Sequence, residues 1–259
     1  MQFENTKQVL IIGAGGNLGS KLTDRGLALG HEVTVLVRNA ESFLARSGLS
    51  RRELSIVVGD ASDANIVARA LEGKDAMVSA AGKVTEGVAF TELFSTIVGA
   101  AEQARSFGGR VWMLAGAAAL MFPGTQRFIA DLPGAPGLYQ AHVKNARRLQ
   151  STALDWSLMC PGPMLDGPPT PPRSDLRITT DVSPLDLGRW RQAPGLVQTL
   201  MLRLKLGELV VRYEDVANII MSRLDREGPF SGRRVGVALP PGETARKDRW
   251  NPASQATSR

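Results

Sequence analysis

A glycine-rich turn directly after the first apolar run constrains the fold of this chain more than any other feature of its sequence. Residues 9–12 (VLII) lead into the turn, and the spacing of leucines predicts a helix over 17–29 after it. The turn comprises Gly13, Ala14, Gly15, Gly16, Asn17, Leu18 and Gly19. In a strand, turn and helix of this kind, the first glycine permits a tight turn, the middle glycines let a pyrophosphate approach the backbone, and the last lets the helix pack closely on the sheet. Since the free N–H groups at the start of the helix also face the phosphates, the pattern predicts dinucleotide binding.

Strand-like and helical segments continue to alternate after this turn. Strand-like runs lie at 31–38, 55–58, 76–79, 110–114 and 156–160. Helical segments are predicted between them at 66–71, 90–105 and 139–154. This alternation is typical of parallel βαβ units, and near-continuous apolar strands are typical of a sheet covered on both faces. We therefore expect an α/β fold, a Rossmann-like doubly wound parallel sheet flanked by helices.

The end of the second strand indicates which dinucleotide binds. The strand over 31–38 (HEVTVLVR) ends at Arg38, about 20 residues beyond the turn, where NAD-binding proteins carry an Asp or Glu that bonds the ribose. A carboxylate there would repel a 2′-phosphate, whereas an arginine attracts it and can stack on adenine. We therefore expect NADP(H) as the cofactor rather than NAD(H). The alternative is that Arg38 is a solvated residue at a strand end.

Two further strand ends carry residues that we expect to contact the cofactor. Asp60, followed by Ala61, comes after the third strand and can accept a hydrogen bond from the adenine amino group. Ala80, Ala81 and Gly82 follow the fourth strand, where small residues let ribose and phosphate pass close to the backbone. Ligands of open α/β sheets bind at the carboxyl ends of the strands, which is where all five residues fall.

The chain changes character after residue 160. Residues 161–195 are rich in proline, which excludes regular helix or central strand over most of this stretch. A helix is predicted over 196–211, with one apolar face formed by Leu196, Val197, Leu200, Met201 and Leu204. We expect this helix to pack on the core. The alternatives are a lid over a substrate cleft and a helix at a membrane surface.

The sequence predicts one domain over residues 1–239. A last helix is expected over 214–224 and an edge strand over 234–238. Within the domain, residues 165–210 are expected to form a small C-terminal region that covers a substrate pocket. The tail over 240–259 is rich in polar residues and proline, and we expect it to be disordered.

Composition excludes several classes of site. The single cysteine, Cys160, excludes an internal disulfide and a CxxC metal site, and with only His31 and His142 no histidine-rich metal site is expected. We therefore expect no metal and a reducing, cytoplasmic location. The start of the chain has no basic segment followed by a long apolar one, so no signal peptide is predicted.

The net charge of +6 fits an anionic ligand. Basic residues are dispersed and only 5% of residues are aromatic, so nucleic-acid binding is not expected. No window has the roughly 18–20 apolar residues of a membrane span. The expected partner is a small-molecule acceptor, and the sequence indicates no oligomeric state.

Several segments resemble a known family. GAGGNLG, LVRN, VVGDASD and DAMVSAAG are similar to the cofactor-binding half of atypical short-chain dehydrogenases. AGAAALMFPG, LDWSLMCPGPMLDGP and VRYEDVANII resemble the NADH-flavin reductase group, related to biliverdin reductase B. The resemblance covers roughly residues 7–168 and 208–238. It implies a Rossmann-like fold, NADP(H) binding and reduction of a flavin, quinone or other conjugated or carbonyl compound. It also implies that Pro161, Gly162 and Pro163 line the nicotinamide site.

The sequence departs from the standard catalytic pattern of short-chain dehydrogenases, which is a Ser after the fifth strand and a Tyr-x-x-x-Lys pair. No hydroxyl follows the fifth strand, and Val143 stands at the lysine position. Tyr139 and Lys144 are five residues apart, about 140° around a helix, and so do not share a face. His142 follows Tyr139 by one helical turn and aligns with a histidine of the biliverdin reductase B-like pattern.

Two mechanisms remain open for the candidate catalytic residues Tyr139, His142 and Lys144. Hydride could pass from NADPH to an acceptor that is already electrophilic, with the proton coming from water. Alternatively, Tyr139 or His142 acts as the acid. Tyr139 and His142 could also be half-buried helix residues without a chemical role, and Lys144 a solvated one.

The leading hypothesis is therefore an NADPH-dependent reductase. A non-catalytic NADP(H)-binding redox sensor is the second hypothesis, favoured by the missing Ser and the offset Lys. A non-redox isomerase or cyclase on the same fold is the third.

Overall fold

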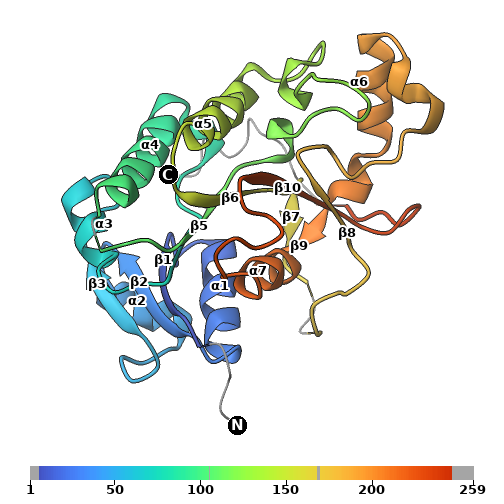
Figure 1. Ribbon diagram of the computed structural model, residues 1–259. Helices are drawn as coiled ribbons and strands as arrows, with labels where there is room; N and C mark the ends of the chain where they lie inside the picture. The colour runs from blue at the N-terminus through green and yellow to red at the C-terminus, as the bar shows by residue number, and fades with distance from the viewer. Residues whose placement is uncertain (1–5, 105, 168–169, 247–259) are drawn as a thin grey trace.

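A computed structural model describes residues 6–104, 106–167 and 170–246. Within these residues an eight-stranded sheet has the order β3-β2-β1-β4-β5-β6-β10-β8 (Figure 1). Neighbouring strands run parallel except for the antiparallel pair β10 and β8. The strands are β1 (Gln8–Ile12), β2 (Glu32–Val37), β3 (Ser55–Val58), β4 (Ala76–Ser79), β5 (Arg110–Leu114), β6 (Asp155–Cys160), β8 (Arg177–Thr180) and β10 (Arg233–Ala238). The predicted Rossmann-like sheet is confirmed.

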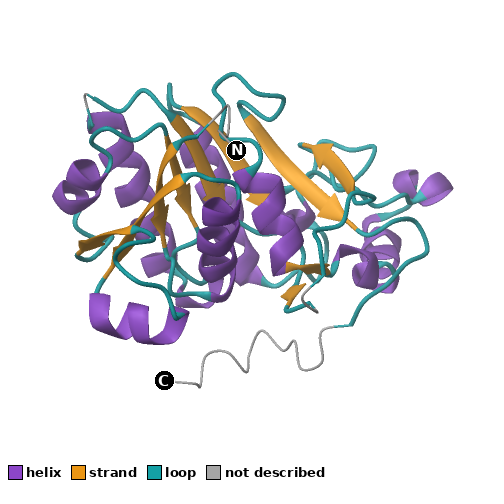
Figure 2. Cartoon of the chain, turned by 90° about the horizontal axis from the view of Figure 1, so that it is seen from below, coloured by secondary structure: helices purple, strands orange, loops and turns teal. Residues whose placement is uncertain are grey.

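Helices cover both faces of this sheet (Figures 1 and 2). They are α1 (Asn17–Ala28), α2 (Ala40–Ser47), α3 (Ala64–Ala70), α4 (Val88–Gln103), α5 (Gln140–Gln150), α6 (Gly195–Leu204) and α7 (Tyr213–Met221). α1 packs against α7, whereas α4 packs against both α3 and α5. Along β1, Leu10 and Ile12 point into the core shared with α3, α4 and α5, while Val9 and Ile11 point into the core shared with α1 and α7. A strand that is apolar on both faces therefore joins two hydrophobic cores.

The prediction that residues 234–238 form an edge strand is wrong. β10 lies between β6 and β8, and Val235 is paired with Met159 on one side and with Thr180 on the other. β8 belongs to the proline-rich stretch in which we expected little regular structure. It is a four-residue strand at the sheet edge, where neighbouring prolines are tolerated because they lie outside the ladder.

Arg177 fastens the start of β8 to the rest of the molecule. Its guanidinium donates hydrogen bonds to the carbonyl oxygens of Leu239 (2.6 Å) and Pro184 (2.9 Å). It also pairs with the buried carboxylate of Glu208, which accepts a second ion pair from Lys205 at 2.9 Å. The bond to Leu239 joins the 165–210 region to the end of β10, whereas the pair with Glu208 joins two parts of the region itself. Breaking a buried pair of this kind would leave an uncompensated charge in the interior.

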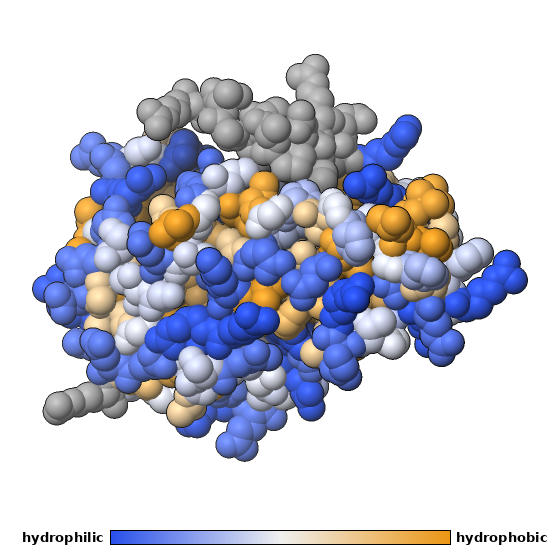
Figure 3. Space-filling model, turned by 90° about the horizontal axis from the view of Figure 1, so that it is seen from above, coloured by the Kyte–Doolittle hydropathy of each residue, from blue (hydrophilic) through white to orange (hydrophobic). Residues whose placement is uncertain are grey.

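The helix predicted over 196–211 is shorter than expected and buries its apolar face only in part. α6 ends at Leu204, and the chain continues through a 3₁₀ turn (Leu206–Leu209) into β9 (Val211–Arg212), which pairs with β7 (Met164–Leu165). Leu196, Leu200 and Leu204 are all exposed. Figure 3 shows an apolar group of side chains at the surface on the right of the view, where α6 lies. The helix does pack on the core through Met201 and Leu202, as expected, but three of the five predicted apolar positions lie at the surface.

Part of the segment predicted to be a disordered tail is described. Residues 240–246 form turns and coil, in which the backbone N–H of Ala245 donates to the carbonyl oxygen of Gly207 at 3.0 Å. Glu243 pairs with Arg173 at 2.8 Å. Residues 247–259 lie outside the described residues, so disorder there stays a prediction. Among the described residues, no helix has the length and apolar composition of a membrane span.

Candidate cofactor and acceptor site

The carboxyl ends of the parallel strands bring the predicted cofactor residues to one edge of the sheet. β1 is the point at which the strand order reverses, with β2 on one side and β4 on the other. The backbone N–H of Ala80, after β4, donates to the carbonyl oxygen of Ile12 at 2.9 Å, so the segments leaving these two strands start side by side. Dinucleotides bind at such a switch point.

Two glycines of the turn are required by the protein's own backbone. Gly13 has a φ of +85°, and a Cβ on it would lie 2.8 Å from the backbone of Ala80 and Ala81. A Cβ on Gly19 would lie 1.9 Å from the carbonyl oxygen of Gly13. α1 can therefore start this close to β1 only because both positions lack side chains.

The remaining glycines, Gly15 and Gly16, are exposed. A Cβ on Gly16 would lie an ordinary 3.4 Å from the carbonyl oxygen of Gly13, whereas a Cβ on Gly15 would lie 3.1 Å from the guanidinium of Arg46. Gly16 is the residue before α1, and no side chain caps the helix there. The first turn of α1 also lacks acidic residues. Its free N–H groups and the positive end of the helix dipole thus remain available to an anion.

The other residues of the turn, and the start of α1, contact the core and α7. Ala14 and Leu18 are buried in the core shared with α7, and Asn17 donates from its side-chain nitrogen to the hydroxyl of Tyr213 at 3.4 Å. Lys21, one turn further along α1, pairs with Glu214 at 2.9 Å. Contacts between α1 and the start of α7 therefore hold the turn in place.

Arg38 and Asp60 lie at the ends of β2 and β3. Both are exposed. The Asp60 carboxylate accepts hydrogen bonds from the backbone N–H and the hydroxyl of Ser62, at 2.9 and 2.8 Å. These two bonds lower the pKa of Asp60, and the positive charge of Arg38 lowers it further. Asp60 is thus an ionised acceptor near a cation, with Ala61 half-buried beside it. Their contacts with adenine stay predictions.

A second arginine near the turn was missed by the sequence analysis. Arg46, in the last turn of α2, donates from Nε to the carbonyl oxygen of Ser42 at 3.2 Å. Its Nη2 lies 3.1 Å from the place where a Cβ on Gly15 would be. In the sequence Arg46 is one of several basic residues after the second strand, and only the direction of α2 brings it over the glycine turn.

The segment after β4 forms the opposite wall. Ala80 and Ala81 are half-buried against Gly13. Gly82 has a φ of +88°, and a Cβ on it would lie 2.7 Å from the ring of Phe90. The turn of the chain thus requires small residues here for its own packing. The approach of the cofactor to this segment stays a prediction.

The ring of His142 lies against the segment that follows β5. Its Nε2 lies 2.8 Å from the place where a Cβ on Gly116 would be, directly after β5. The ring also packs edge-on against Phe90, with centroids 5.6 Å apart. A side chain at Gly116 would therefore collide with the imidazole.

Burial determines the protonation states of His142 and Tyr139. Their rings lie 6.3 Å apart, so the structure brings these two predicted residues together. Burial lowers the pKa of His142 to about 4, and its Nδ1 has no hydrogen-bond partner among the described residues. Burial raises the pKa of Tyr139. At neutral pH both groups are uncharged, and only the tyrosine hydroxyl is a usable proton donor.

Lys144 is not part of this group. It is exposed on α5, whereas Val143 and Asn145 on either side of it are buried. No contact joins Lys144 to Tyr139 within the described ranges. The argument from the five-residue spacing therefore agrees with the geometry, and a catalytic role for Lys144 stays without structural support.

Pro161, Gly162 and Pro163 follow β6 and connect the sheet to the covering region. The carbonyl oxygen of Pro161 accepts from the N–H of Ala117 at 2.8 Å, and that of Pro163 accepts from Val211 at 3.2 Å. A Cβ on Gly162 would lie 2.4 Å from the carbonyl oxygen of Leu209. These contacts give all three residues a packing role, and contact with nicotinamide stays a prediction.

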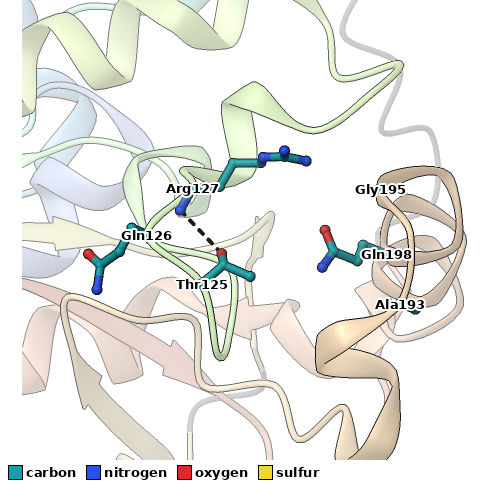
Figure 4. Close-up of a pocket in the computed structure, with 6 residues that line it drawn as sticks. All are labelled: Thr125, Gln126, Arg127, Ala193, Gly195 and Gln198. Carbon is teal, nitrogen blue, oxygen red and sulfur yellow. Dashed lines mark hydrogen bonds between the residues drawn. The ribbon is translucent and has the colours of Figure 1, made fainter.

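A pocket of about 410 Å³ lies between the loop after β5 and α6. It is lined by Thr125, Gln126, Arg127, Ala193, Gly195 and Gln198. Arg127 and Gln198 extend into this space from opposite sides (Figure 4). None of the predicted cofactor or catalytic residues lines it. The pocket is therefore separate from the crevice at the glycine turn.

Comparison with known families agrees with this geometry. The sequence model of a family described as NAD(P)H-binding matches residues 13–188, more than half of the chain. The chain belongs to this NAD(P)H-binding family. A search of the curated proteins found no match.

Solved structures share the fold of this NAD(P)H-binding protein. A candidate epimerase from Bacteroides thetaiotaomicron is 22% identical with a TM-score of 0.70, covering 92% of this chain and 100% of its own. A short-chain dehydrogenase/reductase from Veillonella parvula in complex with NADP is 17% identical with a TM-score of 0.64, covering 95% and 100%. The anaerobillin reductase ChuY from Escherichia coli is 21% identical with a TM-score of 0.57, covering 92% and 99%.

Two glycine variants separate the roles within the turn. Gly19→Ala should lower the free energy of unfolding by about 2–3 kcal/mol, because its Cβ meets backbone. Gly16→Ala should change it by less than about 1 kcal/mol, since its φ of −87° suits any residue. It should nevertheless weaken NADPH binding about tenfold or more by blocking the pyrophosphate. Urea unfolding and cofactor titration check both. Wild-type affinity in Gly16→Ala would contradict the predicted phosphate site.

The buried His142 should make the protein sensitive to acid. Its pKa is 6.5 in an exposed chain and about 4 in the fold, so between these values the unfolded state binds more protons. Stability attributable to His142 is therefore present at neutral pH and is lost as the pH falls from 6.5 toward 4, by about 3 kcal/mol. Unfolding in urea at pH 7 and pH 4 should show this extra loss in wild type and not in His142→Gln. His31→Gln is the control and should keep the wild-type loss.

Proposed function

We propose that this protein is an NADP(H)-dependent oxidoreductase that transfers hydride to a small flavin, quinone, conjugated or carbonyl acceptor. The observation that carries the proposal is the uncapped start of α1 at Gly16, with exposed arginine rather than carboxylate at the end of β2. Family membership supports the nicotinamide cofactor. Reductases among the structures with the same fold support the reaction class.

The residues present fit a phosphorylated dinucleotide. The space above Gly15 and Gly16, with the N–H groups of α1, suits the pyrophosphate. Arg38 supplies a cation at the end of β2 for the 2′-phosphate, for which a guanidinium group is well shaped. Arg46, whose Nη2 lies beside Gly15, supplies a cation for the pyrophosphate. Asp60 accepts from the adenine amino group.

The chemistry follows from what the chain lacks. Bound NADPH supplies the hydride. Within the described residues no lysine contacts Tyr139, burial raises the pKa of its hydroxyl, and the neutral His142 is a weak acid. The protein therefore suits acceptors that are already electrophilic, such as flavins and quinones, for which orientation and exclusion of side reactions matter more than proton donation. Tyr139 supplies a proton where a carbonyl is reduced.

A redox sensor that binds NADP(H) without turnover is the second candidate. Two groups of the standard catalytic set are missing, which favours the sensor. No hydroxyl stands at Gly116 after β5, where the His142 ring leaves no room for a side chain, and in the part of the chain that the structure describes Lys144 is exposed and does not contact Tyr139. A non-redox isomerase on the same fold is the third candidate, and the epimerase among the similar structures favours it.

The choice of cofactor rests on Arg38. Arg38→Ala should weaken NADPH binding about tenfold or more by removing a charge-assisted bond, with little effect on NADH. Arg46→Ala, beside Gly15, should weaken the binding of both nucleotides alike. Titration of each variant with both nucleotides measures this. Arg69→Ala removes an exposed arginine from α3 and should bind as wild type does. Equal losses for NADPH and NADH in Arg38→Ala would contradict the 2′-phosphate assignment.

An acceptor screen tests the reaction. Wild type should oxidise NADPH when a flavin, quinone or conjugated carbonyl compound is added. Tyr139→Phe should keep flavin or quinone reduction within about tenfold and lose about 10²-fold in kcat on carbonyl acceptors. The loss of NADPH absorbance follows both reactions. Tight NADPH binding without oxidation by any acceptor would favour the sensor, and product formation without cofactor would favour the isomerase.

A further inference from the structure

α6 carries a stripe of exposed leucines. Leu196, Leu200 and Leu204 are 74%, 53% and 68% exposed. They are spaced four residues apart and therefore lie along one face of the helix. A single exposed leucine is common on protein surfaces, but a row of three on one helix is a contiguous apolar patch that marks a binding surface.

The surroundings of this stripe are basic. Between residues 187 and 207 the chain has four basic residues and no acidic one. Arg189, Arg191 and Arg203 are exposed, and within the described part of the chain none of the three forms an ion pair with a carboxylate. The charges beside the leucines are thus unneutralised.

An exposed tryptophan lies in the same segment. Trp190 is 41% exposed and belongs to the 3₁₀ turn Gly188–Gln192, which packs against α6. The guanidinium of Arg189 lies 4.9 Å from its ring centroid. Leucines on one helix face, with arginines and a tryptophan next to them, are the combination found in helices that lie in the interface of a bilayer.

We propose that α6 and the preceding 3₁₀ turn form a docking surface for an anionic lipid membrane. The leucine stripe enters the boundary between headgroups and acyl chains, and Arg189, Arg191 and Arg203 contact lipid phosphates. Trp190 lies at the level of the headgroups. α6 lies at the end of the molecule away from β3 (Figure 1), so the helix can meet a flat surface.

A second copy of this chain fits the same face less well. A two-fold symmetric dimer would set the patch against itself, so that basic residues face basic residues. A stripe along one short helix is also narrow compared with the roughly 20–30 residues a side in stable interfaces. Charge complementarity therefore selects an anionic surface.

The pocket between α6 and the loop after β5 lies on the side of the helix away from the docking surface. Gly195 and Gln198 belong to α6, and both line that pocket. Gln198 is buried, on the side of the helix away from the leucines. The docking proposal therefore does not depend on the pocket. The docking proposal itself does not depend on the redox reaction.

Vesicle binding tests the leucine stripe. Wild type should sediment with vesicles of phosphatidylcholine and phosphatidylglycerol, and much less with phosphatidylcholine alone. Replacing the three leucines of the stripe by serine should weaken binding at least about tenfold. Replacing them by methionine keeps an apolar face and should retain binding. Because the leucines are exposed, all variants should keep wild-type circular dichroism and NADPH affinity.

The basic residues are tested separately. Changing Arg189, Arg191 and Arg203 to glutamine should weaken binding to anionic vesicles about tenfold or more, and changing them to lysine should not. The matched control removes the same charge from exposed positions outside this segment, at Arg51, Arg52 and Arg226, and should bind as wild type does. Raising the ionic strength from about 0.1 M to about 0.5 M should weaken wild-type binding.

Three results would overturn the proposal. The first is wild type that does not bind anionic vesicles. The second is equal binding by wild type, the leucine-to-serine variant and the arginine-to-glutamine variant. The third is a dimer in solution, measured by light scattering, that the serine substitutions convert to a monomer, because the face would then belong to a second copy.

Discussion

The candidate site depends on close contact between three pieces of backbone. Gly13 leaves β1 in a conformation that glycine favours, touches the segment after β4 on one side and receives the start of α1 on the other. A methyl group on Gly13 or Gly19 would separate these pieces. Their contact fixes where the helix begins and how its free N–H groups point, and the positions of Arg38, Arg46 and Asp60 matter only relative to that point.

The fold could be predicted largely from local sequence, and the site only in part. Alternating apolar runs and a glycine turn specify βαβ units wherever they occur, so β3, β4 and β5 were predicted with the bounds that the structure has. β8 was missed because a short edge strand is defined mainly by its pairing with a neighbouring strand. That strand, β10, lies about 50 residues later in the chain. α2 was missed as well, and with it the position of Arg46. The exposed leucines of α6 show that apolar spacing predicts which residues share a helix face, but not what that face packs against.

The absence of a side chain at Gly116 and the position of the His142 ring depend on one another. The imidazole of His142 lies where a side chain at Gly116 would be, so the two positions are coupled. The imidazole fills the space beside Gly116, and burial keeps it neutral. Spacing along α5 indicated that Lys144 could not serve Tyr139. It could not show that the ring of His142 leaves no room for a side chain at Gly116, because that contact joins α5 to the segment after β5.

The attachment of β8 limits how the covering region can move. Its ladder to β10 and the contacts of Arg177 with Leu239, Pro184 and Glu208 make this part of the region an extension of the sheet. If the whole region moved as a rigid body, the pairing of β8 with β10 and the bond from Arg177 to Leu239 would both have to break. Motion within the region is therefore more restricted at β8 than in the segment between β8 and Glu208, which carries α6.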